Sequence, residues 1–212
     1  MYYLVFGLVG ILTLWTLGSY IAIRNLEEPS YTVLEKINGY EIRKYDPYIV
    51  AETQITGTYR EALNGGFGRI ADYIFGNNTT KTSISMTAPV LESTSEKIAM
   101  TVPVATTIGE SQTRNVSFVL PSKYTLETLP TPNNPQVTLR EVPGKTVAAL
   151  RFTWYATESR VADKKAQLQQ LLKKDELTAT GPAQVAQYNP PLSMPLTRRN
   201  EILIEVAKVS PE

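Results

Sequence analysis

The side chains responsible for most enzyme chemistry are missing from this chain. Its 212 residues contain no cysteine and no histidine. The first absence excludes disulfides, thiolate zinc sites, iron–sulfur clusters and cysteine nucleophiles, and the second excludes Ser-His-Asp catalysis and imidazole metal sites. Tyrosine, lysine, serine and carboxylates remain as proton-transfer groups. The composition therefore favours a binding protein, and we expect no enzymatic activity.

A short block that could line a ligand pocket occurs twice. Residues Met86–Val90 read M-T-A-P-V, and Met100–Val104, fourteen residues later, read M-T-V-P-V. Proline fixes each block as a strand edge or bulge, and methionine supplies a flexible side chain suited to an irregular apolar cavity. Ordinary core packing explains the two methionines equally well.

The N-terminus has the pattern of a membrane segment. No side chain from Tyr2 to Ile23 is charged, and a helix of that length at about 1.5 Å per residue is long enough to cross a bilayer core. The basic region of a signal peptide is missing and the apolar run is long, so we expect a retained anchor at residues 1–24 and a linker at 25–30. The lipid bilayer is thus an expected partner of a single-pass membrane protein, with the soluble domain outside the cytoplasm.

The rest of the chain has the charge of an ordinary soluble domain. All charged residues lie from Arg24 onward, and the net charge is +1. This balance gives no electrostatic reason to expect nucleic acid as a partner. We expect one domain at residues 31–207, followed by a tail at 208–212.

Alternating and helical patterns predict the elements of this domain. Two alternating runs, Tyr31–Ile37 and Tyr40–Tyr45, flank Asn38-Gly39, which is a strong hairpin signal. Apolar residues at helical spacing predict helices over about 59–75 and 158–174. The other predicted strands are 49–55, 84–86, 98–104, 116–120, 137–142, 146–152, 185–188 and 201–206.

The order strand, helix, strands occurs twice, from Ile49 to Leu120 and from Thr146 to Val206. No clear sequence identity links the two halves, so the repeat is one of topology. Two such units predict an α+β domain with a barrel-like antiparallel sheet and two flanking helices. A pocket is expected between a helix and the sheet, or across the junction of the halves.

Four further motifs accompany the repeated block. They are Tyr40–Tyr45, Phe118–Pro121, Tyr188–Pro191 and Arg198–Glu201. Together with the M-T-x-P-V blocks they resemble the SOUL haem-binding protein family, over about residues 31–206. The resemblance implies a distorted antiparallel β-barrel with two helices, built from a duplicated strand-helix-strand-strand unit. It also implies binding of haem or a related tetrapyrrole without turnover.

A bound porphyrin would need an apolar floor and cations for its two carboxylates. On the first predicted helix of the domain, Phe67, Ile70 and Tyr73 are candidates for the floor, and Arg69 is a candidate partner for a propionate. Ordinary core packing of this helix is at least as good an interpretation.

Arg198, beside Arg199, offers a second cationic position. The alternative for each arginine is a solvated surface charge or a salt bridge to Glu201 or Glu205. The sequence leaves both interpretations open.

The missing histidine bears on how iron would be held. Histidine is the axial iron ligand in some members of the family that this chain resembles. Here a protein ligand would have to be tyrosinate, methionine or a neutral amine, and Tyr73, Met86 and Met100 are the nearest candidates. The alternative is a pocket that holds the tetrapyrrole by apolar contact alone. We favour the second, which predicts that metal-free porphyrins also bind.

The sequence thus predicts a membrane-tethered protein that binds haem or a related porphyrin non-covalently and buffers it or hands it on. Two alternatives keep the fold. In one, the pocket takes another amphipathic hydrophobic small molecule. In the other, the domain is an interaction module whose pocket is vestigial, and the missing histidine is the best support for it.

Overall fold

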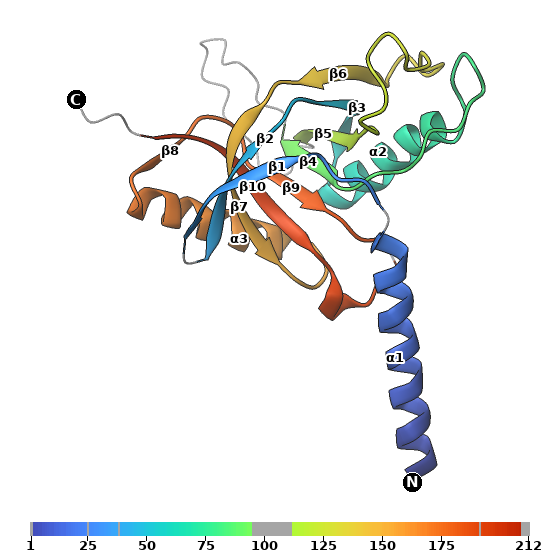
Figure 1. Ribbon diagram of the computed structural model, residues 1–212, viewed down its shortest axis with the longest axis vertical. Helices are drawn as coiled ribbons and strands as arrows, with labels where there is room; N and C mark the ends of the chain where they lie inside the picture. Colours follow the sequence, from blue (N-terminus) through green and yellow to red (C-terminus); the bar gives the residue numbers. More distant parts are fainter. Residues whose placement is uncertain (1, 25, 38, 95–111, 191, 209–212) are drawn as a thin grey trace.

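A computed structural model of the chain describes residues 2–24, 26–37, 39–94, 112–190 and 192–208. Helix α1 (Tyr2–Arg24) projects from one side of a body built on one large antiparallel sheet, and the N-terminus lies at the far end of this helix (Figure 1). Two further helices, α2 (Tyr59–Ile74) and α3 (Glu158–Lys174), pack against the two halves of the sheet.

The strands alternate with these helices along the chain. In chain order they are β1 (Tyr31–Ile37), β2 (Tyr40–Tyr45), β3 (Tyr48–Gly57), β4 (Val90–Thr94), β5 (Gln112–Val119), β6 (Thr138–Val142), β7 (Lys145–Phe152), β8 (Leu177–Ala179), β9 (Gln184–Gln187) and β10 (Asn200–Lys208), and a short 3-10 helix, η1 (Pro195–Thr197), precedes β10. Every ladder between them is antiparallel.

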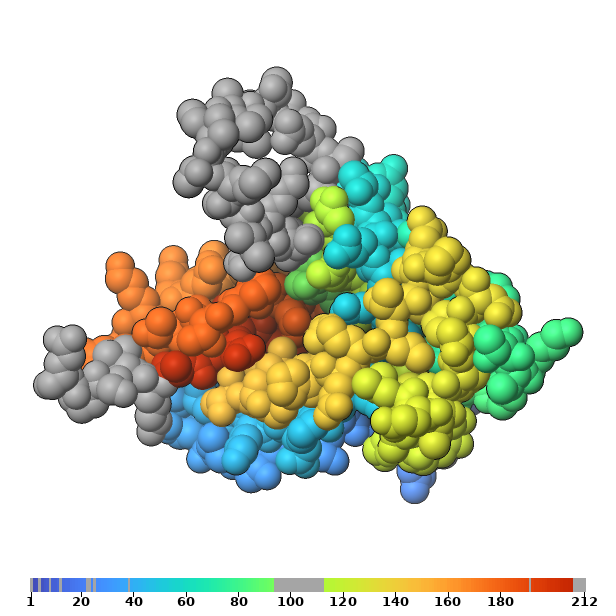
Figure 2. Space-filling model, turned by 90° about the horizontal axis from the view of Figure 1, so that it is seen from above, coloured from blue at the N-terminus to red at the C-terminus, as the bar shows by residue number. Residues whose placement is uncertain are grey.

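The strand order places two strand-helix-strand-strand segments next to each other in one sheet. The order across the sheet is β1-β2-β7-β10-β9-β4-β5-β3-β6, with β8 paired to β10. One unit is β3-α2-β4-β5 and the other is β7-α3-β9-β10, and they meet where β4 pairs with β9. Each unit is extended by one more strand. Strand β2 comes before the first unit in the chain but pairs with β7 of the second, and β6 comes before the second unit but pairs with β3 of the first. Figure 2 shows the orange and red C-terminal part of the second unit beside the cyan and green part of the first.

The first hairpin forms where the sequence predicts it. Strands β1 and β2 pair from Tyr31↔Tyr45 to Ile37↔Tyr40, with one irregularity in register between Val33 and Glu35. Gly39 in the turn has a φ of 103°, which glycine adopts without the steric cost that a side chain would bring.

Helix α2 begins with a complete capping box and depends on one glycine. The hydroxyl of Thr58 accepts from the N–H of Glu61, and the Glu61 carboxylate accepts from the N–H of Thr58. A Cβ at Gly66 would lie 2.5 Å from the Cβ of Val116 on β5. Gly66 therefore lets the helix approach the sheet closely, which offsets the helix propensity that glycine lacks.

Helix α3 lies on the other half with a narrower buried face. Thr157 caps it, and only Leu168 and Leu172 are buried along its described length. They pack with Ile202 and Ile204 of β10 in the core of that half. A separate core under α2 contains Ile70, Tyr73, Ile74, Val116 and Phe118.

The structure differs from the sequence-based expectations at residues 84–86 and in the closure of the sheet. Residues 84–86 are not a strand, and Ile84 instead donates its backbone N–H to the carbonyl of Ile74. The described ladders form an open path from β1 to β6, so the predicted barrel is confirmed only as a mostly antiparallel sheet with flanking helices. The predicted strand at 98–104 lies outside the described residues.

The structure does not support the membrane span predicted at residues 1–24. Among the residues that are described, no helix is both long and apolar enough to cross a membrane.

Candidate functional site

A cavity of about 920 Å³ lies between the first turns of α2 and the start of α3. Its volume is within the range of about 300–1,000 Å³ that is typical of small-molecule sites. We call it the helix cavity. Its lining residues come from both halves of the domain and are Thr58, Tyr59, Arg60, Leu63, Asn64, Phe67, Val90, Tyr155, Ala156, Thr157, Glu158, Gln187, Asn189 and Arg198.

The helix cavity is positioned by the junction of the two units. Val90 of β4 and Gln187 of β9 are directly paired across that junction, and both line the cavity. The capping residues of the two helices, Thr58 and Thr157, also line it. The sequence suggests a pocket either between a helix and the sheet or across the junction of the halves, and the helix cavity lies across the junction.

One wall of the helix cavity is apolar and aromatic. Leu63 and Phe67 lie one turn apart on α2, and Tyr155 faces them from the segment before α3. The ring of Phe67 packs edge-on against Phe118 at 5.3 Å, so it is supported by the core although it remains partly exposed. Such a wall suits a flat apolar ligand.

Two arginines give the helix cavity a positive side. The guanidinium of Arg198 is buried, donates to the carbonyls of Ser193 and Pro190, and stacks over the ring of Tyr155 at 4.4 Å. Burial lowers the pKa of Arg198 from its ordinary value, but an arginine so affected is still a cation near neutral pH. Arg60, on the first turn of α2, is exposed. Both cations are suited to carboxylates on a ligand.

Asn189 brings an unsatisfied donor to the same cavity. Its Oδ1 accepts a hydrogen bond from the backbone N–H of Arg199 at 2.6 Å, whereas its Nδ2 is buried and has no partner among the residues that the structure describes. A buried donor without a partner costs about 1–3 kcal/mol. A ligand oxygen in the helix cavity would remove that cost.

Three charged residues, Glu92, Arg114 and Glu158, border the cavity next to Tyr59, and we call them the edge cluster. Arg114 donates to the buried carboxylate of Glu92 at 2.9 Å and to the exposed carboxylate of Glu158 at 3.2 Å. Its guanidinium lies 5.6 Å from the ring centroid of Tyr59. Burial, with the charge of Glu92, raises the pKa of Tyr59 well above its ordinary value, so its hydroxyl stays protonated and accepts from Nε2 of Gln187.

A second charged cluster is enclosed within the other half, and we call it the sealed cluster. The carboxylate of Glu201, which has no exposed surface, accepts from Arg43 at 2.7 and 3.2 Å, from Arg199 at 3.0 Å and from the hydroxyl of Tyr188 at 2.8 Å. Burial alone would raise the pKa of Glu201, but the bond from Arg43 and the charges of Arg199 and Arg43 outweigh it and hold the pKa below its ordinary value. Arg199 also bonds to Glu28 at 2.9 Å.

The predicted site residues are divided between the cavity and the core. Phe67 and Arg198 line the helix cavity together. Ile70 and Tyr73 are fully buried under α2, and the Tyr73 hydroxyl donates to the carbonyl of Pro130 at 2.9 Å. Arg69 does not line the helix cavity, and its guanidinium instead donates to the carbonyl of Gln54 and the hydroxyl of Thr53.

The first M-T-x-P-V block serves the packing of the sheet. Met86 packs against the core under α2. Thr87 donates to the carbonyl of Val119, and Ala88 donates to that of Glu27, so the block joins β5 to the segment after α1. Met100 and the whole second block lie outside the described residues.

Several cavity residues were not singled out from the sequence. Tyr59, Tyr155 and the Gln187–Asn189 segment lie far apart in the sequence, and only the pairing of β4 with β9 brings Gln187 and Asn189 to the cavity. Asn189 belongs to the Tyr188–Pro191 motif, but the motif does not indicate that its side chain lines a pocket. One local signal was present. Each helix starts at a threonine cap, and each cap borders the cavity.

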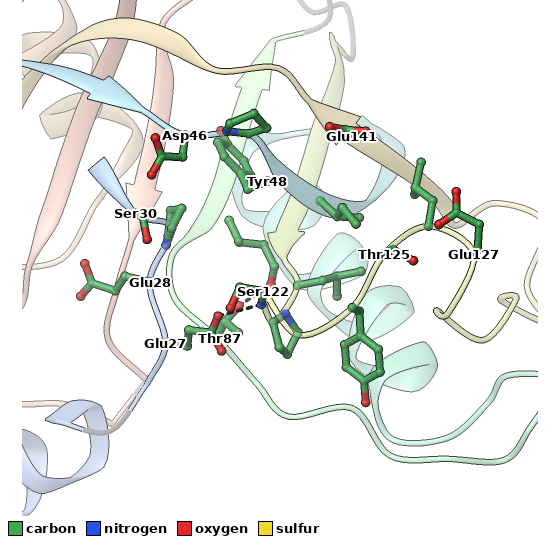
Figure 3. Close-up of a pocket in the computed structure, with 18 residues that line it drawn as sticks. Glu27, Glu28, Ser30, Asp46, Tyr48, Thr87, Ser122, Thr125, Glu127 and Glu141 are labelled. Carbon is green, nitrogen blue, oxygen red and sulfur yellow. Dashed lines mark hydrogen bonds between the residues drawn. The ribbon is translucent and has the colours of Figure 1, made fainter. Parts of the chain in front are cut away.

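A smaller hollow of about 340 Å³ lies near the segment that follows α1, and we call it the acidic hollow (Figure 3). Five carboxylates line it, and its described lining contains no lysine or arginine. They are those of Glu27, Glu28, Asp46, Glu127 and Glu141. Glu27 is engaged by the N–H of Ser122 at 2.7 Å. This charge does not suit a ligand with carboxylates, and among the described residues no group of three carboxylates is arranged to hold a metal ion.

The sequence matches a known family along most of its length. The family model for SOUL heme-binding protein matches residues 26–205. No curated protein matches the chain.

Solved structures share the fold at low sequence identity. The C-terminal domain of EcmrR aligns with a TM-score of 0.59 at 12% identity, covering 84% of this chain and 99% of that one. An uncharacterized conserved protein from Listeria innocua aligns with a TM-score of 0.51 at 11% identity, covering 86% and 93%. A structure described as a hydrolase from Listeria innocua aligns with a TM-score of 0.50 at 8% identity, covering 86% and 93%. These similarities establish the fold alone.

Proposed function

The chain belongs to the SOUL heme-binding protein family, and from this we propose that it binds haem or a related tetrapyrrole in the helix cavity without catalysing a reaction. Family membership supports the class of ligand. The observation that carries the choice of site is the composition of the cavity, which combines an aromatic wall with two arginines. The acidic hollow has the opposite charge and about a third of the volume.

The residues of the helix cavity fit each part of a porphyrin. Leu63, Phe67 and Tyr155 would contact the apolar disc. Arg60 and Arg198 would hold the propionates, and the unpaired Nδ2 of Asn189 would donate to an oxygen of the ligand. Haem, when bound, would supply its iron chemistry, and the protein would determine how far water reaches it.

We further propose that the iron receives no side-chain ligand from the predicted set. Tyr73 is committed to Pro130 in the core, burial raises its pKa to about 12, and Met86 packs away from the cavity. Tyr59 does line the cavity, but its hydroxyl is held protonated, which disfavours a tyrosinate ligand. Binding would then rest on apolar contact and on the carboxylates. This favours a second candidate function, in which another flat amphipathic anion is the ligand.

Membrane attachment is the remaining part of the proposal. Its support is helix α1, whose described side chains include no charge before Arg24 and which exposes large apolar residues along its length. Porphyrins partition into apolar surroundings, so a receiver at a bilayer would meet more of its ligand.

A haemin titration of the full chain in detergent micelles tests the binding proposal, with empty micelles as the blank. We expect a saturable change of the Soret band at one haemin per chain. Metal-free protoporphyrin, followed by its fluorescence, should bind within a few-fold of haemin. A change that does not saturate would refute haem binding. A large preference for haemin over protoporphyrin would refute binding without an iron ligand.

A matched pair of variants tests the site. Asn64→Trp places a bulky ring in the lining of the helix cavity from an exposed position, and Leu126→Trp does the same in the acidic hollow. The first should weaken haemin binding by more than about tenfold, which corresponds to about 1.4 kcal/mol. The second should leave it unchanged. The reverse result would move the site to the acidic hollow.

A further inference from the structure

Helix α1 is not a free extension, because its second half is fastened to the segment before β10. Nε1 of Trp15 donates to the carbonyl of Leu192 at 2.8 Å. The backbone N–H of Met194 donates to the hydroxyl of Ser19 at 2.9 Å, and the hydroxyl of Thr16 lies 2.8 Å from the Met194 sulfur. The helix therefore has a defined position beside this segment.

Trp154 stands next to the same segment in a strained conformation. Its φ is 72°, in the left-handed region that a bulky side chain rarely adopts, and such strain costs about 1–3 kcal/mol. Two hydrogen bonds hold it there, since its N–H donates to the carbonyl of Pro195 and its carbonyl accepts from the buried amide of Asn200. Trp154 is nevertheless 46% exposed. The fold thus keeps an exposed tryptophan in a strained backbone conformation that costs free energy.

Exposed apolar residues of α1 and of the segment before β10 are brought together with Trp154 by these bonds, and we call them the apolar rim. It consists of Trp154, Leu192, Leu196 and Trp15, with exposed fractions from 42% to 87%. Both tryptophans of the chain belong to it. Tyr155, the neighbour of Trp154, lines the helix cavity, so the apolar rim adjoins the cavity wall.

We propose that the apolar rim rests on a lipid bilayer and that the helix cavity exchanges its ligand with the membrane at this point. The inference rests on the proposed function for the nature of the ligand. The occupant is identified by α1, because exposed apolar residues such as Val5, Phe6, Val9 and Ile11 lie on several faces of the helix. Lipid can contact exposed apolar side chains on several faces of a helix, whereas a globular partner would cover only one side of it. Tryptophan is the residue enriched at the bilayer interface.

The position of the fastening sets the geometry of this contact. Figure 1 shows α1 leaving the body on the side of the segment that leads into β10, so the apolar part of the helix and the apolar rim meet on that side. Lipid around the second half of α1 would therefore reach Leu192, Leu196 and Trp154 as well. The carbonyls of Pro190 and Ser193, on the same segment, hold Arg198 in the cavity wall.

Quenching by brominated lipid tests the contact directly. The full chain is reconstituted into phosphatidylcholine vesicles with plain or brominated acyl chains. Trp154 is then isolated by comparing the native chain with Trp154→Phe. We expect the emission assigned to Trp154 to lose most of its intensity in the brominated vesicles. Equal emission in the two kinds of vesicle would overturn the proposal.

A charge placed in the apolar rim tests its role in ligand exchange. The double variant Leu192→Asp, Leu196→Asp should reduce quenching of Trp154 and slow haemin uptake from loaded vesicles several-fold, while its haemin titration in micelles stays as in the native chain. Leu126→Asp, an exposed leucine of the acidic hollow, is the matched control and should change neither. Unchanged uptake by the double variant would overturn the proposal.

The outcomes separate this proposal from the proposed function. Quenching without saturable haemin binding would refute haem as the ligand and leave the membrane contact standing. Saturable binding without quenching would refute the membrane contact alone. If Trp154 is unquenched and chemical cross-linking joins two chains through the apolar rim, a second copy is its occupant and the proposal is wrong.

Discussion

The two halves of the domain each contain a cluster of charges, and the two clusters differ in what they face. In the sealed cluster, the carboxylate of Glu201 receives donors from Arg43, Arg199 and Tyr188 and touches no solvent. In the edge cluster, Arg114 connects the buried Glu92 to the exposed Glu158, and its Nε has no partner in the described part of the chain. The first is complete without a ligand, whereas the second opens on the helix cavity.

The difference shows what the recognisable motifs of the sequence do. Tyr40–Tyr45, Tyr188–Pro191 and Arg198–Glu201 converge on the sealed cluster, through Arg43, Tyr188 and Glu201. Arg43, Tyr188 and Glu201, one residue from each of these three motifs, therefore stabilise the fold. The residues that line the cavity are mostly outside the motifs, and the exceptions are Asn189, Arg198 and Val90, the last residue of the first M-T-x-P-V block.

The largest effect is expected from Glu201→Gln. The variant leaves the buried charges of Arg43 and Arg199 without their shared carboxylate, and breaking a buried pair costs about 3–5 kcal/mol. Chemical denaturation should show this loss, and Glu205→Gln, a partly exposed carboxylate on the same strand, should show little. Haemin affinity of the folded fraction should be unchanged. A reduced affinity would mean that the sealed cluster also serves the ligand.

The pH dependence of stability tests the same cluster. Because the pKa of Glu201 is lower in the folded chain than in the unfolded one, its contribution is present above the unfolded value of about 4.3 and is lost as the pH falls through the folded pKa. The gap in stability between the native chain and Glu201→Gln should therefore be widest near neutral pH and shrink on acidification. A gap independent of pH would show that the lost carboxylate charge is not the cause.

The sequence predicted local structure better than it predicted the site, for a physical reason. The hairpin around Gly39 and helix α3 follow from turn chemistry and helical spacing, which act between near neighbours. The cavity depends on the pairing of Val90 with Gln187, which are almost a hundred residues apart. Helical spacing also placed Ile70 and Tyr73 on the correct face of α2, but it could not tell a face that meets the sheet from one that meets a ligand.

A smaller loss of stability is expected from Glu92→Gln in the edge cluster. Glu92 is buried, but Arg114 keeps its bond to Glu158 when the charge of Glu92 is removed. The loss should be about 1–3 kcal/mol, as for a buried hydrogen-bonded charge whose partner retains another contact. Unlike Glu201→Gln, this variant should also change haemin affinity, because Arg114 lies over Tyr59 in the cavity lining. An affinity equal to that of the native chain would remove the distinction between the two clusters.

The exposed arginine of the helix cavity should affect ligand binding with little effect on stability. Arg60→Glu reverses a charge that would face a propionate, and the expected loss of haemin affinity is about tenfold, or about 1.4 kcal/mol. Arg69→Glu is the control on the same helix, since that side chain points to Gln54 and away from the cavity. Equal losses in the two variants would indicate a general effect of charge on an anionic ligand.

The smallest effect, and the most specific, is expected from Glu158→Gln. Its carboxylate is 66% exposed and pairs with Arg114 at the edge of the helix cavity, so the pair should contribute less than about 1 kcal/mol to stability. The same carboxylate is the only negative charge in the described cavity lining, and it opposes a ligand with carboxylates. Haemin affinity should therefore rise a few-fold in a titration, while Glu141→Gln in the acidic hollow leaves it unchanged. A gain of affinity from an exposed residue, beside none from the sealed cluster, would separate the edge cluster, which borders the ligand, from the sealed cluster, which supports the fold. A lower affinity in Glu158→Gln would instead show that this carboxylate helps to form the site.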